Sequence, residues 1–153
     1  VQVGAQAPDF TLPSIDGTMV TLSSFQGRKN VMLTFVPAAW TPVCSDQWPG
    51  YNLVRDMFEE RDAVVIGISV DNLPTLHSWV REMGGLWFSV LSDFWPHGRV
   101  ASLYGVLRGD GTAERAVFVI DHRGVVRYVN VNDINTRPSL QPIMQALDDL
   151  AGQ

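Results

Sequence analysis

The hydrophobic and polar positions of this chain follow two different periods, which separate expected strands from expected helices. The apolar runs 30–36 and 63–70 are continuous and rich in β-branched and aromatic residues, which is typical of strands buried on both faces of a sheet. Shorter runs of the same kind predict strands at 88–93, 114–121 and 124–131. The last two are separated only by the turn sequence "DHRG", so we expect them to pair as a hairpin.

Helical periodicity occupies most of the intervals between these strands. We expect helices over 41–58, 73–84, 98–106 and 138–151. Thr41 is a good N-cap residue, and Pro42 suits the first position of a helix. The Pro49-Gly50 pair is expected to kink or split the helix that follows.

The order of these elements predicts the fold class. The turn signal Asp16-Gly17 lies between two short β-rich runs and indicates an N-terminal hairpin. Strands then alternate with helices before the late hairpin. This order predicts an α/β, thioredoxin-like fold, with a central mixed β-sheet flanked by helices. No repeat, low-complexity tract or linker interrupts the chain, so we expect one domain over residues 1–153.

Charge and composition exclude several classes of function. The net charge is −5 and the sequence pI is near 5.0, whereas a protein that binds nucleic acid or an anionic membrane needs a basic face. No apolar stretch approaches the roughly 20 residues that cross a bilayer. The N-terminus lacks the charged-then-apolar pattern of a secretory signal, and the only cysteine cannot form an internal disulfide, so we expect a cytoplasmic protein.

That cysteine, Cys44, is the strongest chemical signal in the sequence. If Thr41 is the N-cap, the thiol lies in the first helical turn after a buried strand, where free backbone N–H groups favour thiolate over thiol. A helix end stabilises a thiolate by only ~0.3 to 1 kcal/mol. Lowering the pKa of a thiol from about 8.5 to about 6 requires ~3.4 kcal/mol. We therefore expect an accessible thiol with a cation nearby. Arg115 is the best candidate, because it begins a strand that reaches the same sheet edge if it runs antiparallel to 30–36.

These residues can also stabilise a leaving group. The Thr41 hydroxyl, the Cys44 backbone N–H and Arg115 could supply donors to a developing oxyanion. Two other interpretations remain open: a small hydrophobic core cysteine, or a Cys–His hydrolase that recruits His97. The histidines show no metal-ligand spacing, and no nucleotide-binding fingerprint is present, so we expect neither a metal nor an organic cofactor.

Pro37, Thr41 and Cys44 stand in the spacing PxxxTxxC, which resembles the active-site signature of peroxiredoxins. The strings "APDFTL", "GISVD", "LSDFWPHG", "YGV" and "RAVFVID" extend the resemblance over nearly the whole chain, which is most similar to the one-cysteine alkyl hydroperoxide reductase E type. The resemblance implies that Cys44 is the peroxidatic cysteine, that Pro37 shields it, and that Thr41 and Arg115 bind peroxide. It also places Trp40 in the substrate-binding wall, where relatives commonly carry a smaller aromatic residue.

The implied activity is a thiol-dependent peroxidase that reduces hydrogen peroxide, organic hydroperoxides or peroxynitrite through a sulfenic acid. With one cysteine, the reductant must be an external thiol: thioredoxin, a glutaredoxin-like protein or a low-molecular-weight thiol. The resemblance also implies a homodimer or a higher homo-oligomer. The alternative is a redox sensor or interaction module that signals through oxidised Cys44. Relatives often orient the arginine with a Glu shortly after the cysteine, where this chain has Asp46 and Gln47.

Overall fold

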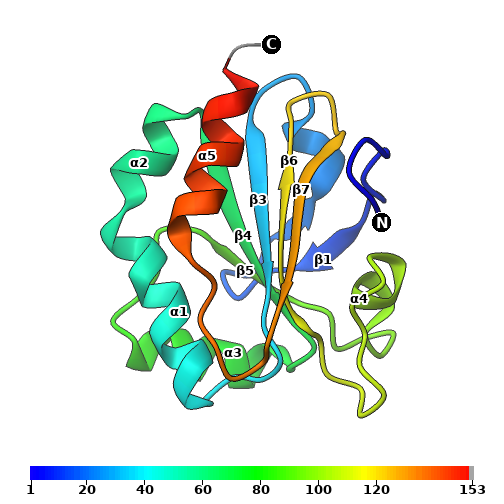
Figure 1. Ribbon diagram of the computed structural model, residues 1–153. Helices are drawn as coiled ribbons and strands as arrows, with labels where there is room; N and C mark the ends of the chain where they lie inside the picture. The colour runs from blue at the N-terminus through cyan, green and yellow to red at the C-terminus, as the bar shows by residue number, and fades with distance from the viewer. Residues whose placement is uncertain (152–153) are drawn as a thin grey trace.

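A five-stranded sheet forms the centre of the computed structural model, which describes residues 1–151 (Figure 1). Its strand order is β5-β4-β3-β6-β7. The strands are β3 (Asn30–Phe35), β4 (Ala63–Ser69), β5 (Ser89–Ser92), β6 (Arg115–Ile120) and β7 (Val126–Asn132). The first three are parallel, whereas β6 pairs antiparallel with both β3 and β7. The predicted mixed sheet is therefore confirmed, while residues 152–153 of the predicted single domain lie outside the described residues.

The predicted N-terminal hairpin is also present. Strand β1 (Thr11–Pro13) pairs antiparallel with β2 (Met19–Thr21). The turn between them contains Gly17 at φ +88°, a left-handed conformation that favours glycine. A short 3-10 helix, η1 (Leu22–Phe25), follows β2, and the sequence pattern did not predict it.

Five α-helices complete the fold of residues 1–151. They are α1 (Pro42–Leu53), α2 (Arg55–Glu60), α3 (Leu73–Glu82), α4 (Arg99–Leu103) and α5 (Leu140–Leu150). The helix predicted over 41–58 is split in two, as expected. The break lies at Val54 (φ −115°, ψ 28°), however, and not at Pro49-Gly50. Pro49 lacks a backbone N–H and so removes one hydrogen-bond donor, but helix α1 continues through it. Trp48 and Tyr51 on either side of Pro49 are buried in the core, and their packing maintains the helix.

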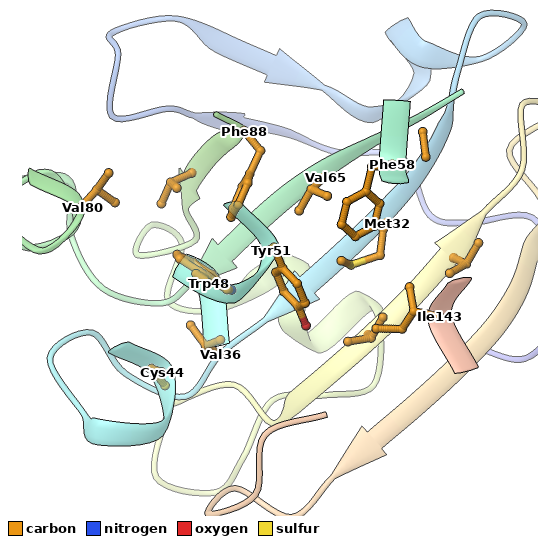
Figure 2. Close-up of a cluster of buried hydrophobic side chains, with 14 of the residues drawn as sticks. Met32, Val36, Cys44, Trp48, Tyr51, Phe58, Val65, Val80, Phe88 and Ile143 are labelled. Atoms are coloured by element: carbon orange, nitrogen blue, oxygen red, sulfur yellow. The ribbon is translucent and has the colours of Figure 1, made fainter. Parts of the chain in front are cut away.

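The side chains of β3 alternate between two hydrophobic cores. Met32 and Val36 face the core beneath α1, α2, α3 and α5, whereas Leu33 and Phe35 face the core beneath the hairpin and α4. Figure 2 shows the first of these cores, with Cys44 at one end of the cluster on the first turn of α1. The central strand is buried on both faces, so it provides a rigid support for the segment that follows it.

Gly67 on β4 provides a test of this packing. A Cβ atom at Gly67 would lie 2.8 Å from Cζ2 of the buried Trp48 indole. We expect Gly67→Ala to lower the free energy of unfolding by ~1–3 kcal/mol through overpacking, measured by urea denaturation. Gly109→Ala is the control, because its Cβ would meet no heavy atom within 4 Å. Equal stability of the two variants would contradict the close contact between Gly67 and Trp48.

Candidate active site

Cys44 lies in the first turn of α1, as the sequence predicts. Thr41 occupies the N-cap position with extended backbone (φ −82°, ψ 151°), and Pro42 begins the helix. The helix follows directly on the loop 36–41, which begins where β3 ends. The backbone N–H of Cys44 has no acceptor among residues 1–151, so it remains available to an anion at the helix N-terminus.

The loop 36–41 is fastened to the end of β4. The N–H of Val36 donates to Ile68 O (3.1 Å), and the N–H of Ala39 donates to Oδ2 of Asp71 (2.8 Å). The same carboxylate oxygen accepts from the Ser69 hydroxyl. Trp40 adopts φ +69°, which turns the chain into α1. These contacts fix the position of the cysteine-bearing helix relative to the sheet.

Arg115 reaches Cys44 from the neighbouring strand, as the sequence predicts. In the antiparallel register Ala116 faces Phe35, so Arg115, the first residue of β6, lies next to the end of β3. Arg115 is 1% exposed, and Nη2 of its guanidinium lies 3.2 Å from Cys44 Sγ. Nε and Nη2 also donate to Ile134 O at 3.0 and 2.8 Å. The buried guanidinium is therefore held against the sulfur.

Thr41 behaves differently from its predicted role as a donor. Its hydroxyl makes no capping hydrogen bond and donates to Ala38 O at 2.9 Å. Because a hydroxyl has a single proton, Oγ1 now offers only lone pairs to a bound molecule. The predicted oxyanion donors are thus reduced to the Cys44 N–H and Arg115, and Thr41 is placed to accept a hydrogen bond.

Pro37, Thr41 and Arg115 line one pocket of about 480 Å³. Most of its wall is apolar, and Arg108 and Asp110 add charges at the wall. Cys44 is 0% exposed, so the prediction of an accessible thiol is wrong for this structure. The sulfur is covered because Cys44 packs into the hydrophobic core between α1 and the sheet.

The predicted place of Trp40 in the pocket wall is not observed. Its side chain is 51% exposed and is not among the residues that line the pocket. With φ at +69°, its backbone conformation differs from that of Thr41, which is extended, and of Pro42, which begins the helix.

Asp46 and Gln47, which stand where relatives carry a Glu, have different environments in the structure. Asp46 is exposed and pairs with Arg137, 2.9 Å away at the surface. Gln47 is buried, and its Oε1 accepts from Nη1 of Arg115 at 2.7 Å. The i,i+3 spacing of Cys44 and Gln47 on one helix face was the signal that could have found this contact.

The alternative chemistries receive no support from the geometry. His77, His97 and His122 are all exposed, and none contacts Cys44 in the described part of the chain. His97 lies instead against the Trp95 ring, with centroids 4.8 Å apart. Among residues 1–151, no three His, Cys, Asp or Glu side chains are grouped so that they could hold a metal ion. No helix in this range is long and apolar enough to cross a membrane.

The family model for the AhpC/TSA family matches residues 3–129. The chain belongs to the AhpC/TSA family. It is 40% identical over 132 residues to alkyl hydroperoxide reductase E of Mycobacterium tuberculosis, and the match covers 86% of each chain. It is 33% identical over 157 residues to peroxiredoxin 2 of Caldanaerobacter subterraneus, covering 97% of this chain and 69% of that one.

Solved structures agree with this family. The reduced 2-Cys peroxiredoxin of Plasmodium vivax superposes with a TM-score of 0.91 at 30% identity, covering 99% of this chain and 83% of that chain. Peroxidoxin BcpB of M. tuberculosis superposes with a TM-score of 0.85 at 29% identity, covering 99% and 97%. The predicted family, thioredoxin-like fold and enzyme class are confirmed. This AhpC/TSA protein is a thiol-dependent peroxidase, and its single cysteine fits the one-cysteine type.

Proposed function

We propose that this protein reduces hydrogen peroxide, organic hydroperoxides or peroxynitrite with Cys44 as the nucleophile. The observation that carries the proposal is the 3.2 Å contact between Nη2 of the buried Arg115 and Cys44 Sγ. A guanidinium is always charged and favours an anionic sulfur beside it. Because the contact lies at a helix N-terminus, two separate sources of positive potential act on one thiol.

The proposed reaction has two stages. The Cys44 thiolate attacks one oxygen of the O–O bond, and an S–O bond forms. The other oxygen leaves as hydroxide or alkoxide, which takes up a proton, or as nitrite when the substrate is peroxynitrite. The sulfur is oxidised to a sulfenic acid, and the peroxide is reduced to water, alcohol or nitrite. An external thiol then displaces water to give a mixed disulfide, and a second thiol releases Cys44 with formation of the reductant's own disulfide.

Four of the predicted site residues have distinct parts in this proposal, whereas Trp40 has none. Arg115 and the Cys44 N–H donate to the oxygen that leaves, where charge develops in the transition state. Thr41 Oγ1 accepts a hydrogen bond from the peroxide, because its own proton is donated to Ala38 O. Pro37 is buried in the pocket wall, where it limits the access of water to the intermediate.

Thr41→Val should therefore lower kcat/KM for peroxide about 10- to 100-fold, because the variant keeps the shape and loses the acceptor, and a group left without its hydrogen-bond partner costs ~1–3 kcal/mol. Thr41→Ser is the matched control and should retain most of the activity, since it keeps the hydroxyl. The rates are measured by peroxide consumption with excess thiol. If Thr41→Val reacts as fast as Thr41→Ser, the hydroxyl has no part in the reaction.

The physiological partners form part of the same proposal. The reductant is thioredoxin, a glutaredoxin-like protein or a low-molecular-weight thiol, and a cytoplasmic location would provide it. A homodimer or higher homo-oligomer is supported by the exposed aromatic side chains of Phe94 and Trp95, since large aromatic rings are enriched in interfaces. Sedimentation velocity measures the assembly state.

A redox sensor is the second candidate, and the complete burial of Cys44 is the observation that favours it. A sulfur that no reductant reaches turns over slowly once oxidised. Steady-state peroxide consumption with each of the three classes of thiol separates the two functions. Many turnovers per protein support the enzyme, whereas one rapid oxidation followed by a stable mixed complex with a partner supports the sensor.

A further inference from the structure

Arg115 is a buried cation without a carboxylate partner. Its residue is 1% exposed, yet the ion pairs within 4.0 Å that residues 1–151 form all involve other cations. A buried charge is costly unless it is paired or fully hydrogen-bonded. The identity of its hydrogen-bond acceptors therefore determines where the compensating negative charge can reside.

The acceptors of Arg115 are neutral except for one atom. Ile134 O is a backbone carbonyl that receives two of its hydrogen bonds, and Gln47 Oε1 is an amide oxygen 2.7 Å from Nη1. The remaining acceptor is Cys44 Sγ. The sulfur is thus the only one of these three groups that can become an anion by losing a proton.

The orientation of the Gln47 amide follows from its other contacts. Its Nε2 donates to the Tyr51 hydroxyl at 2.9 Å and to Thr34 Oγ1 at 3.1 Å. Because the nitrogen faces these two oxygens, Oε1 must face Arg115. Burial raises the pKa of Tyr51 above its usual value, so this hydroxyl is neutral at physiological pH.

We infer that the neutral amide of Gln47 leaves the charge of the buried Arg115 uncompensated, so that the Cys44 sulfur is the only one of the acceptors of Arg115 that can supply the compensating anion. The electrostatic part of this inference concerns the reduced protein alone. Its consequence for peroxide reduction rests on the proposed function.

Other charged groups near the site are more exposed than Arg115. Arg108 and Asp110 line the pocket, and their charges lie 3.5 Å apart, so they largely offset each other. On α1, Asp46 is paired with Arg137 from the segment that precedes α5. Asp71, at the end of β4, accepts from Ala39 N–H and Ser69. These charges stay the same in every Gln47 variant, so a difference in the ionisation of Cys44 between variants reports on residue 47.

Gln47→Glu tests the inference, because it adds a carboxylate beside Arg115 with almost no change in size. A second anion within reach of the guanidinium disfavours the thiolate. We expect the thiolate absorbance at ~240 nm to develop at a pH about one unit higher than in the unmodified protein, which corresponds to ~1.4 kcal/mol. The rate of oxidation by peroxide at neutral pH should fall by the same factor as the thiolate fraction, which is at most about tenfold for a shift of one unit.

Two further variants separate charge from packing. Gln47→Met removes the acceptor without adding charge, so it should slow oxidation while shifting the pH profile less than Gln47→Glu does. Asp46→Asn changes a charge on the same helix at the exposed position, and should leave the profile within ~0.3 pH unit because the surface pair is screened by solvent. Circular dichroism confirms the fold of each variant.

Equal profiles for Gln47→Glu and the unmodified protein, or equal shifts for Gln47→Glu and Gln47→Met, would overturn the inference. The thiolate absorbance requires no peroxide. A protein whose thiolate responds as expected but which does not consume peroxide would therefore contradict the proposed function and leave the inference intact.

Discussion

Replacing Arg115 by alanine is expected to slow the oxidation of Cys44 by peroxide ~10²- to 10³-fold, which is the usual effect of removing one preorganised donor to an oxyanion. Loss of thiolate alone cannot account for so large an effect. An unperturbed cysteine is already a few per cent ionised at neutral pH, so complete ionisation changes the rate only tens-fold. The excess must come from the transition state, where the guanidinium donates to the leaving oxygen.

Stopped-flow tryptophan fluorescence across a pH range separates these two contributions. Trp79 donates from Nε1 to the hydroxyl of Ser45 at 2.9 Å, so an indole lies close to the reacting turn and can report on its oxidation. Arg115→Lys is the matched variant, because it keeps the charge and loses the planar fork that contacts sulfur and Ile134 O together. If the rate deficit disappears at high pH, where the thiol is fully ionised, Arg115 acts on ionisation only.

Replacing Cys44 by serine is expected to abolish peroxide turnover and leave the fold intact. A serine hydroxyl stays protonated at physiological pH, so no nucleophile is present to attack the O–O bond. The side chain is almost the same size, and it retains an acceptor for Arg115 Nη2. Peroxide consumption and far-ultraviolet circular dichroism are measured on the same sample. Near-normal turnover by this folded variant would end the proposal.

The sequence pattern predicted those parts of the fold that local periodicity controls. The largely buried strands β3 and β4 and the amphipathic helices α3 and α5 lie where the pattern placed them, within one or two residues at most ends. The break between α1 and α2 was misplaced, because burial of Trp48 and Tyr51 outweighs the lost donor of Pro49. Tertiary packing of this kind leaves no local signal.

The contacts of the candidate site also fall into those that the sequence could predict and those that it could not. The contact of Arg115 with Cys44 was predicted on the condition that its strand runs antiparallel to 30–36, and the structure shows this pairing of β6 with β3. The carbonyl of Ile134 was not, because a backbone oxygen in a loop has no residue type that marks it. The direction of the Thr41 proton depends on the path of the loop 36–41, which the sequence does not specify either.

The burial of Cys44 is the part of the site that sequence reasoning assigned wrongly. The thiol lies at the start of a helix, a position typical of exposed reactive cysteines, but the same helix face carries Gln47 and Trp48 into the core. One turn of α1 therefore has both a chemical and a packing role. The oxidised sulfur must become reachable for an external thiol if turnover is to occur.

Intact-mass spectrometry after one equivalent of hydrogen peroxide tests the central claim most directly. The account predicts that the unmodified protein gains one oxygen atom, that fragmentation places it on Cys44, and that a thiol reductant removes it. The Cys44→Ser variant should gain none under the same conditions. An unchanged mass, or an added oxygen located on a methionine with Cys44 still reduced, would contradict the account.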